Sequence, residues 1–199
     1  MSFAAPCGSR LSASALPSLV DLIIARAKRT PYFDLADYMG RFWLREHNAA
    51  KSNWAMRVHH IKRSDRDRVL HDHPWKNVSI LMRGGYWEVL DGEMQRAVEN
   101  GFEGAAPHLQ ALYGEILVAG GRELKRSQRA ALRAAGVCWR GRCAVVVRDA
   151  RLRHRLIVPK GRDAWSIFIM GPKVQEWGFH TRDGWVHNEA YTAQFGRDA

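Results

Sequence analysis

HDHPWKNVSILMRGG, residues 71–85, is the stretch of sequence that decides the fold. In an extended strand alternate side chains share a face, so His71 and His73 point to one side while Asp72 points to the other. On a helix the two imidazoles would diverge. Two histidines on one face of a strand predict part of a metal site, which needs at least one more ligand.

The best candidate for the third ligand is His154. In the period-two pattern of residues 152–158, the face that carries this histidine is otherwise aliphatic, with Leu152, Leu156 and Val158. A histidine on a buried face must be hydrogen-bonded or coordinated, because an unsatisfied polar group there is costly. We therefore predict a metal site of His71, His73 and His154. Two alternatives stay open: another third ligand, with His59 or His180 next in line, or histidines held by hydrogen bonds alone.

These histidines and their spacing resemble a known family. His71-x-His73 followed by Asn77 and Gly84 is similar to the first motif of the cupin superfamily, in which a Glu stands where this chain has Asn77. The Gly that usually precedes the first histidine is Asp65 here, and His154 alone represents the second motif.

The flanking segments carry the resemblance further, to small uncharacterised cupin-like metalloproteins of phages and bacteria. It covers about Tyr32 to Tyr191, except most of residues 92–143, and its flanking segments are Ser64–Arg68, Trp177–Phe179 and Gly184–Val186. The resemblance implies a mainly β fold, a cupin-type double-stranded β-helix (jelly-roll barrel) with a metal inside. Jelly rolls often pair through exposed strands, so it also suggests a homodimer.

The rest of the chain is expected to form one domain around this barrel. Residues 1–16 are predicted to be a flexible tail and residues 17–199 a single cupin-like domain. Helices are predicted at residues 17–29 and 35–47, and strands at 54–62, 77–83, 144–148, 152–158 and 164–170. Residues 92–143 break the β pattern as an insertion, with a basic amphipathic helix at 123–135 that ends at Gly136. Whether the insertion is a lid, a partner surface or a decorated loop stays open.

Gly84-Gly85 is predicted to be a two-residue hairpin turn. Across that hairpin Arg83 faces Tyr86, and Leu81 faces Glu88, on the same side of the sheet. Arg83, Tyr86 and Glu88 are therefore candidate catalytic residues that bind substrate or handle protons. The alternative is an exposed cross-strand ion pair.

Charge and composition limit the partners. The chain carries 31 Lys and Arg against 20 Asp and Glu, a net charge of +11. Such a balance suits an anionic small molecule or nucleic acid, but the basic residues are dispersed along the chain, so nucleic acid is not favoured. No apolar run approaches the roughly 20 residues of a membrane span. Three cysteines and the lack of a secretory pattern predict a cytoplasmic protein.

The predicted chemistry follows from three imidazole ligands with open coordination positions. Fe(II) or Zn is the expected divalent metal ion. Iron would give a dioxygenase or hydroxylase, and zinc a bound water of lowered pKa. Asn77 is at best a weak neutral ligand, and the missing Glu charge favours a small anionic substrate. The alternative is a non-catalytic module of the same fold that binds a small molecule or nucleic acid.

Overall fold

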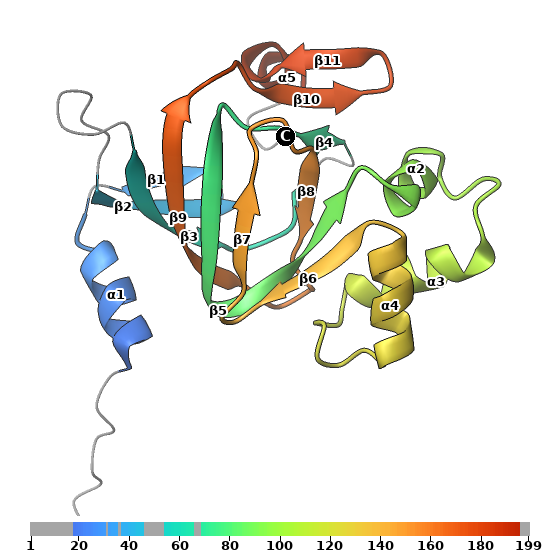
Figure 1. The fold of residues 1–199 in the computed structure, drawn as a ribbon, viewed down its shortest axis with the longest axis horizontal. Coiled ribbons are helices and arrows are strands. Elements are labelled where there is room, and N and C mark those ends of the chain that lie inside the picture. Colours follow the sequence, from blue (N-terminus) through green and yellow to red (C-terminus); the bar gives the residue numbers. More distant parts are fainter. Residues whose placement is uncertain (1–17, 31, 36, 46–53, 66–68, 196–199) are drawn as a thin grey trace, which may run out of the picture.

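The computed structural model describes residues 18–30, 32–35, 37–45, 54–65 and 69–195 (Figure 1). The predicted tail at residues 1–16 lies outside this part of the chain, as do residues 66–68 of the flanking motif. The division into a tail and one domain therefore stays a prediction. None of the described helices is both long and apolar enough to cross a membrane.

Strands dominate the described chain, which confirms the predicted mainly β fold. The strands are β1 (Tyr32–Leu35), β2 (Met39–Arg45), β3 (Ala55–Ile61), β4 (Leu70–His71), β5 (Trp75–Leu90), β6 (Val137–Gly141), β7 (Val145–Arg148), β8 (His154–Ile157), β9 (Ala164–Lys173), β10 (Gly178–Thr181) and β11 (Gly184–His187). The helices are α1 (Leu19–Ala27), α2 (Glu93–Glu99), α3 (Pro107–Ile116), α4 (Arg126–Ala134) and α5 (Asn188–Phe195).

The strands pair antiparallel in the order β1-β2-β3-β9-β5-β8-β4-β10-β11, with β6 and β7 also paired to β5. β5 is the central element, because it belongs to both walls of the barrel. Its first half pairs with β7 and β9, and its second half pairs with β6 and β8. Strands far apart in the sequence thereby enclose a common interior (Figure 1).

The predicted hairpin at Gly84-Gly85 is wrong, since β5 continues through both glycines and its two halves pair with other strands instead of with each other. Gly84 has φ of +66°, and a Cβ at this position would lie 1.9 Å from the carbonyl oxygen of Asp163. Glycine is therefore required by a positive φ and by the close approach of the backbone at Asp163, just before β9. The pairing of β5 with β9 also shifts register between Leu81 and Arg83. The glycines mark a bend from one wall of the barrel to the other.

The first predicted helix is confirmed, and the second is wrong. α1 begins after Ser18, which forms a capping box with Asp21, and it packs on the outer face of the barrel. The second predicted helix, at residues 35–47, is replaced over its described residues by the end of β1 and by β2, which pair as a hairpin; residues 36, 46 and 47 lie outside the described chain. Its apolar residues lack period-two alternation because both faces of β2 are covered: Phe42 packs with α1, and Trp43 packs against Phe168 and Met170.

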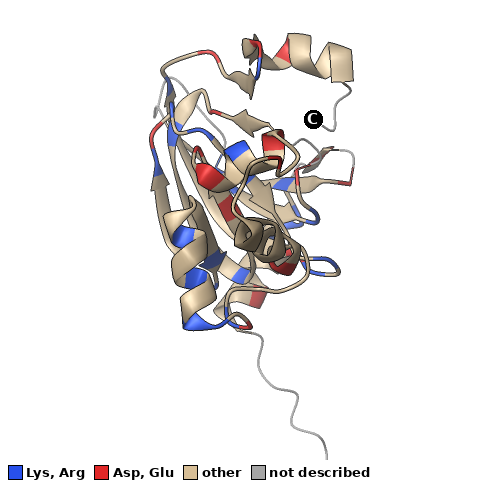
Figure 2. Cartoon of the chain, turned by 90° about the vertical axis from the view of Figure 1, so that its right-hand side faces the viewer, with Lys and Arg blue, Asp and Glu red and all other residues tan. Residues whose placement is uncertain are grey.

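Three helices of the insertion form a layer on the outside of the barrel. α2, α3 and α4 lie together at one side of the strands, at the right in Figure 1. Their buried core includes Met94, Leu109 and Leu132, and it packs against Trp87 of β5 and Ile157 of β8. The predicted helix at 123–135 is confirmed as α4, followed by Gly136 at φ +86°, whereas α2 and α3 were not predicted. Lys and Arg are spread over several elements on the face shown in Figure 2.

Candidate metal centre

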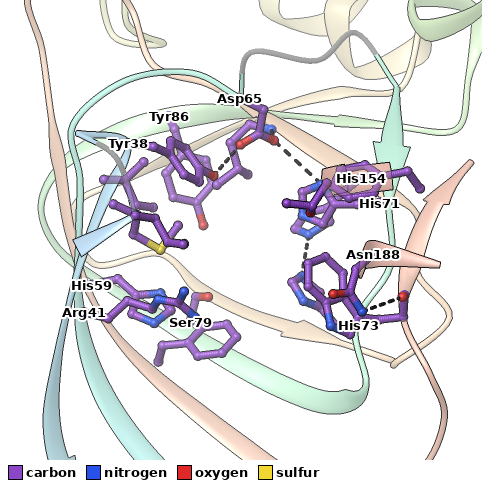
Figure 3. A pocket seen from close by; sticks show the side chains of 18 of the residues that line it. Tyr38, Arg41, His59, Asp65, His71, His73, Ser79, Tyr86, His154 and Asn188 are labelled. Atoms are coloured by element: carbon purple, nitrogen blue, oxygen red, sulfur yellow. Dashed lines mark hydrogen bonds and ion pairs between the residues drawn. The ribbon is translucent and has the colours of Figure 1, made fainter. Parts of the chain in front are cut away.

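The barrel contains a cavity of about 910 Å³ (Figure 3). This volume lies at the upper end of the roughly 300–1,000 Å³ typical of pockets for small organic ligands. Its lining comes from β1 to β5, β7 to β10 and α5, and none of the lining residues belongs to the insertion. The insertion is therefore not a lid over this cavity.

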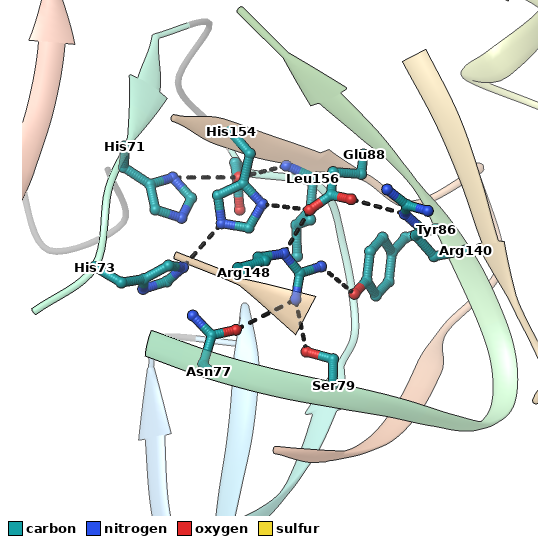
Figure 4. A network of polar contacts seen from close by, with 11 residues as sticks. His71, His73, Asn77, Ser79, Tyr86, Glu88, Arg140, Arg148, His154 and Leu156 are labelled. Carbon is teal, nitrogen blue, oxygen red and sulfur yellow. Dashed lines mark hydrogen bonds and ion pairs between the residues drawn. The ribbon is translucent and has the colours of Figure 1, made fainter. Parts of the chain in front are cut away.

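The structure brings together the three histidines that the sequence singles out. His71 ends β4 opposite His154, the first residue of β8, and His73 lies in the short segment between β4 and β5. Their ligand atoms all lie within 4.8 Å of one another, and the Nε2 atoms of His73 and His154 are 2.8 Å apart (Figure 4). Three nitrogens bound to one metal at about 2.0–2.1 Å stand roughly 3 Å apart. The donor set therefore fits a metal ion after small side-chain adjustments.

Burial keeps two of these imidazoles in the form that binds metals. Burial and the nearby His154 ring lower the pKa of His71 to about 4. The pKa of His73 lies well below its ordinary value, through burial first and then through His154 and His71. Both side chains are therefore neutral at pH 7, with a nitrogen lone pair for a metal.

Glu88 fixes the orientation of His154. This carboxylate is fully buried and accepts a 2.8 Å hydrogen bond from His154 Nδ1, so Nε2 of the same ring faces the other histidines. It also pairs with Arg148 Nε at 2.5 Å and with Arg140 Nε at 2.7 Å (Figure 4). Burial alone would raise the pKa of Glu88, but the His154 hydrogen bond and the charges of Arg148 and Arg140 hold it below its ordinary value.

Arg148 is a central residue of the site that the sequence analysis missed. Its guanidinium donates to the hydroxyls of Ser79 at 2.8 Å and Tyr86 at 3.0 Å, and to Asn77 Oδ1 at 3.4 Å. The side-chain oxygen of Asn77, expected to be at best a weak metal ligand, thus accepts a hydrogen bond from Arg148. The period-two pattern of the strand at 145–148 could have identified Arg148, because it puts this arginine on the same face as Val146. In the structure Val146 and Arg148 are buried, while Val145 and Val147 are exposed.

The candidate catalytic residues separate into two groups. Tyr86 lines the cavity, and Glu88 is fully buried behind the lining. Burial raises the pKa of the Tyr86 hydroxyl above its ordinary value. Arg83 is on the outside of the barrel, and its half-exposed guanidinium pairs with Asp21 of α1. The expectation that Arg83 shares a face with Tyr86 is wrong, because it rested on the hairpin that does not form.

Neither alternative third ligand, His180 or His59, belongs to the cluster of His71, His73 and His154 in the described chain. His180 Nε2 donates to Asp72 Oδ2 at 3.1 Å, while Asp72 Oδ1 accepts a bond from the backbone N–H of Gly178. Asp72 thus points away from its neighbouring histidines, as predicted, and anchors β10. His59 does line the cavity, on the wall opposite the three histidines (Figure 3).

Comparisons with known proteins find weak similarity to several solved structures. No family model and no curated protein matches the sequence. Among solved structures, the polyketide cyclase RemF from Streptomyces resistomycificus is similar at 7% identity and a TM-score of 0.49, covering 86% of this chain and 92% of that one. A cupin-like protein from Thermotoga maritima is similar at 12% identity and a TM-score of 0.43, covering 83% and 92%. An RmlC-like cupin from Shewanella frigidimarina is similar at 10% identity and a TM-score of 0.42, covering 74% and 88%.

The antiparallel barrel and the histidines at its inner wall together account for the resemblance found in the sequence. The likeness to solved structures concerns the arrangement of strands and carries no residue roles. The described chain is a mainly β barrel of antiparallel strands, as the sequence predicts, and membership of the cupin superfamily stays a prediction that rests on the histidine motif.

Proposed function

We propose that this protein is a mononuclear metal-dependent enzyme that acts on a small molecule bound in the barrel. The ligands are His71, His73 and His154, and the metal is Fe(II) or Zn. The observation that carries the proposal is the convergence of three imidazoles, within 4.8 Å, on the wall of a large cavity. A purely structural metal site would be closed by protein ligands instead of facing an open space.

The bound metal would supply Lewis-acid chemistry as Zn, or oxygen chemistry of the dioxygenase or hydroxylase type as Fe(II). The protein contributes the surroundings. Glu88 orients His154, and the two arginines that hold this carboxylate ionised leave it to position the ligand rather than to act as a free base. Tyr86 keeps its proton and lines the cavity, so its hydroxyl is the candidate donor to substrate.

The proposal is tested first by elemental analysis of protein purified without an affinity tag. The His71→Ala/His154→Ala double variant should lose a metal that the native protein holds in near-stoichiometric amount. The matched control is His108→Ala, which removes an exposed imidazole of α3 and should keep the metal. Circular dichroism establishes that all three proteins are folded. Native protein that takes up neither Fe(II) nor Zn, even after anaerobic reloading, would contradict the metalloenzyme.

The identity of the metal then separates the reactions. Iron predicts substrate-dependent consumption of O2, whereas zinc predicts hydrolysis or proton transfer without it. The cytoplasmic location and the homodimer expected from the sequence stay predictions, and size-exclusion chromatography with light scattering tests the second.

A further inference from the structure

In the described part of the chain, the wall of the barrel opposite the three histidines carries buried nitrogen atoms without a hydrogen-bond partner. We refer to Arg41, Arg57 and His59 as the cationic wall. Arg41 and His59 line the cavity, across from His71 and His73 in Figure 3. The Nε atoms of both arginines and the Nε2 atom of His59 are buried and lack any hydrogen-bond partner in the described part of the chain.

Strand pairing places these side chains on one inner face. Arg41 of β2 stands directly opposite His59 of β3, which in turn stands opposite Ser166 of β9. The His59 ring stacks on Phe168 with 4.5 Å between centroids, and the centroid of Phe168 is 6.3 Å from that of His73. One aromatic ring therefore lies between the cationic wall and the candidate metal ligands, within the same cavity.

The charge of Arg41 is not neutralised by the acidic residues of the lining. Asp34 pairs with Lys62 at 2.8 Å, and Asp65 accepts bonds from the Tyr38 hydroxyl and from the backbone N–H of Leu156. The remaining acid of the lining, Glu189, is exposed on α5.

The pKa shifts of the cationic wall are those of groups without a counter-charge. Burial lowers the pKa of Arg41, and burial followed by the charge of Arg41 lowers that of Arg57 to about 10. Burial and the two arginines hold the pKa of His59 well below its ordinary value, so His59 is a neutral donor at pH 7. Arg41 itself is partly buried and lies over the Phe33 ring at 5.1 Å, but its Nε atom and Nε2 of His59 are buried without a hydrogen-bond partner. Buried polar atoms without a partner cost stability, and a bound ligand can supply the missing partner.

We propose that Arg41 and His59 bind the carboxylate of an organic monoanion in this cavity. A monoanion matches the site because Arg148, the other arginine of the lining, is already paired with Glu88, which leaves the charge of Arg41 to the ligand. Arg57 stacks on the Trp43 ring at 4.0 Å and does not line the cavity. The flat edge of Arg41 suits the two oxygens of a carboxylate.

The rest of the ligand is apolar, because the lining also includes Met39, Ile61 and Phe168. That this ligand is the substrate of the enzyme rests on the function proposed above, whereas the binding of the carboxylate does not.

The experiment compares hexanoate with hexanamide by calorimetric titration of the metal-free protein. The two probes share size and apolar body and differ in charge. The native protein should bind hexanoate at least tenfold more tightly than hexanamide, and Arg41→Gln should abolish this preference. Arg162→Gln removes an exposed arginine that pairs with Glu123, and it should leave the preference intact.

Thermal unfolding provides a second readout. Without probe, Arg41→Gln should be about as stable as the native protein, because Arg41 is only partly buried and the variant gives up its contact with the Phe33 ring but no ion pair in the described part of the chain. Hexanoate should then raise the Tm of the native protein and not that of the variant. His59→Phe keeps the stack on Phe168 and should weaken hexanoate severalfold while leaving hexanamide unchanged.

Equal affinity of the native protein for both probes, or a preference that survives in Arg41→Gln, overturns the proposal. If Arg41→Gln fails to fold, Arg41 is a structural residue, and an unchanged hexanoate affinity in His59→Phe overturns the carboxylate site. Metal analysis of the same preparations keeps the two proposals apart. Protein that binds hexanoate and no metal contradicts the proposed enzyme alone, and protein that binds metal without preferring hexanoate contradicts the carboxylate site alone.

Discussion

Replacing Glu88 by Gln separates the structural part of the site from its metal chemistry. Glu88→Gln preserves shape but removes the negative charge between two arginines and His154. Glu88 is fully buried and Arg148 is 2% exposed, so the variant leaves a buried guanidinium without its counter-charge. Breaking such a pair costs about 3–5 kcal/mol. The contact with Arg140, which is 27% exposed, adds roughly 1 kcal/mol or less.

The expected loss is measurable by urea or thermal unfolding. For a chain of this size about 1 kcal/mol shifts Tm by roughly 2–4 °C, so Glu88→Gln should lower Tm by about 6–20 °C. The double variant Glu88→Gln/Arg148→Met should recover most of this loss, because it removes the stranded charge. Metal affinity, measured by competition with a chelator, should fall about 10- to 100-fold in both variants, since His154 loses its orienting carboxylate.

The control is Glu115→Gln, which removes an exposed carboxylate from α3 and should change neither quantity. If the free energy of unfolding of Glu88→Gln lies within about 1 kcal/mol of the native value, the reasoning is refuted, since Arg148 would then not depend on the charge of Glu88. Unchanged metal affinity in a destabilised variant would show that Glu88 does not position the metal ligand.

Two further variants address the bend of β5 and the pH dependence of stability. Gly84→Ala should lower the free energy of unfolding by about 2–5 kcal/mol, because the alanine would have a positive φ and a Cβ 1.9 Å from a backbone atom. The control Gly161→Ala, with φ +74° and no atom within 4 Å of the Cβ, should lower it by about 1–2 kcal/mol. Equal losses for the two variants in chemical denaturation would contradict this reasoning. The native protein should lose stability below pH 6.5 more steeply than His59→Phe, because the folded pKa of His59 is lowered and the unfolded chain binds the proton first. The contribution of His59 to the free energy of unfolding is complete above about pH 6.5 and is roughly 1.4 kcal/mol smaller one pH unit below. Parallel curves of unfolding free energy against pH for the two proteins would exclude this contribution. The charged and titratable groups that face this imidazole are Arg41, Arg57 and His73.

The convergence of the histidines could be predicted because the spacing of His71 and His73 places them on one side of an extended segment, although β4 ends at His71. His71 and His73 share a side of the chain, and the aliphatic neighbours of His154 indicate a buried face. These local patterns are independent of the rest of the barrel, so they could be recognised without knowing which strands pair. The same holds for α1, whose start is encoded by a capping box.

The errors come from residues whose environment depends on elements distant in the sequence. Phe42 and Trp43 are adjacent and both packed, because α1 covers one side of β2 and the barrel interior lies on the other. Burial on both sides removes the alternation by which a strand is recognised. Arg148 was passed over for a similar reason: its partner Glu88 is 60 residues away, and only strand pairing brings the two together.

The course of β5 has a further consequence for how the chain can vary. Before the register shift, the residues that face the interior have odd numbers, such as Ser79 and Leu81, and after it they have even numbers, such as Tyr86 and Glu88. The register shift in β5 therefore determines which residues face the interior in both walls of the barrel. Loss or gain of one residue at this step would turn Tyr86 and Glu88 to the outer side and bring Trp87 and Val89 inward. The length of the chain is thus fixed at the bend more strictly than in the outer helices, although no proposed metal ligand lies there.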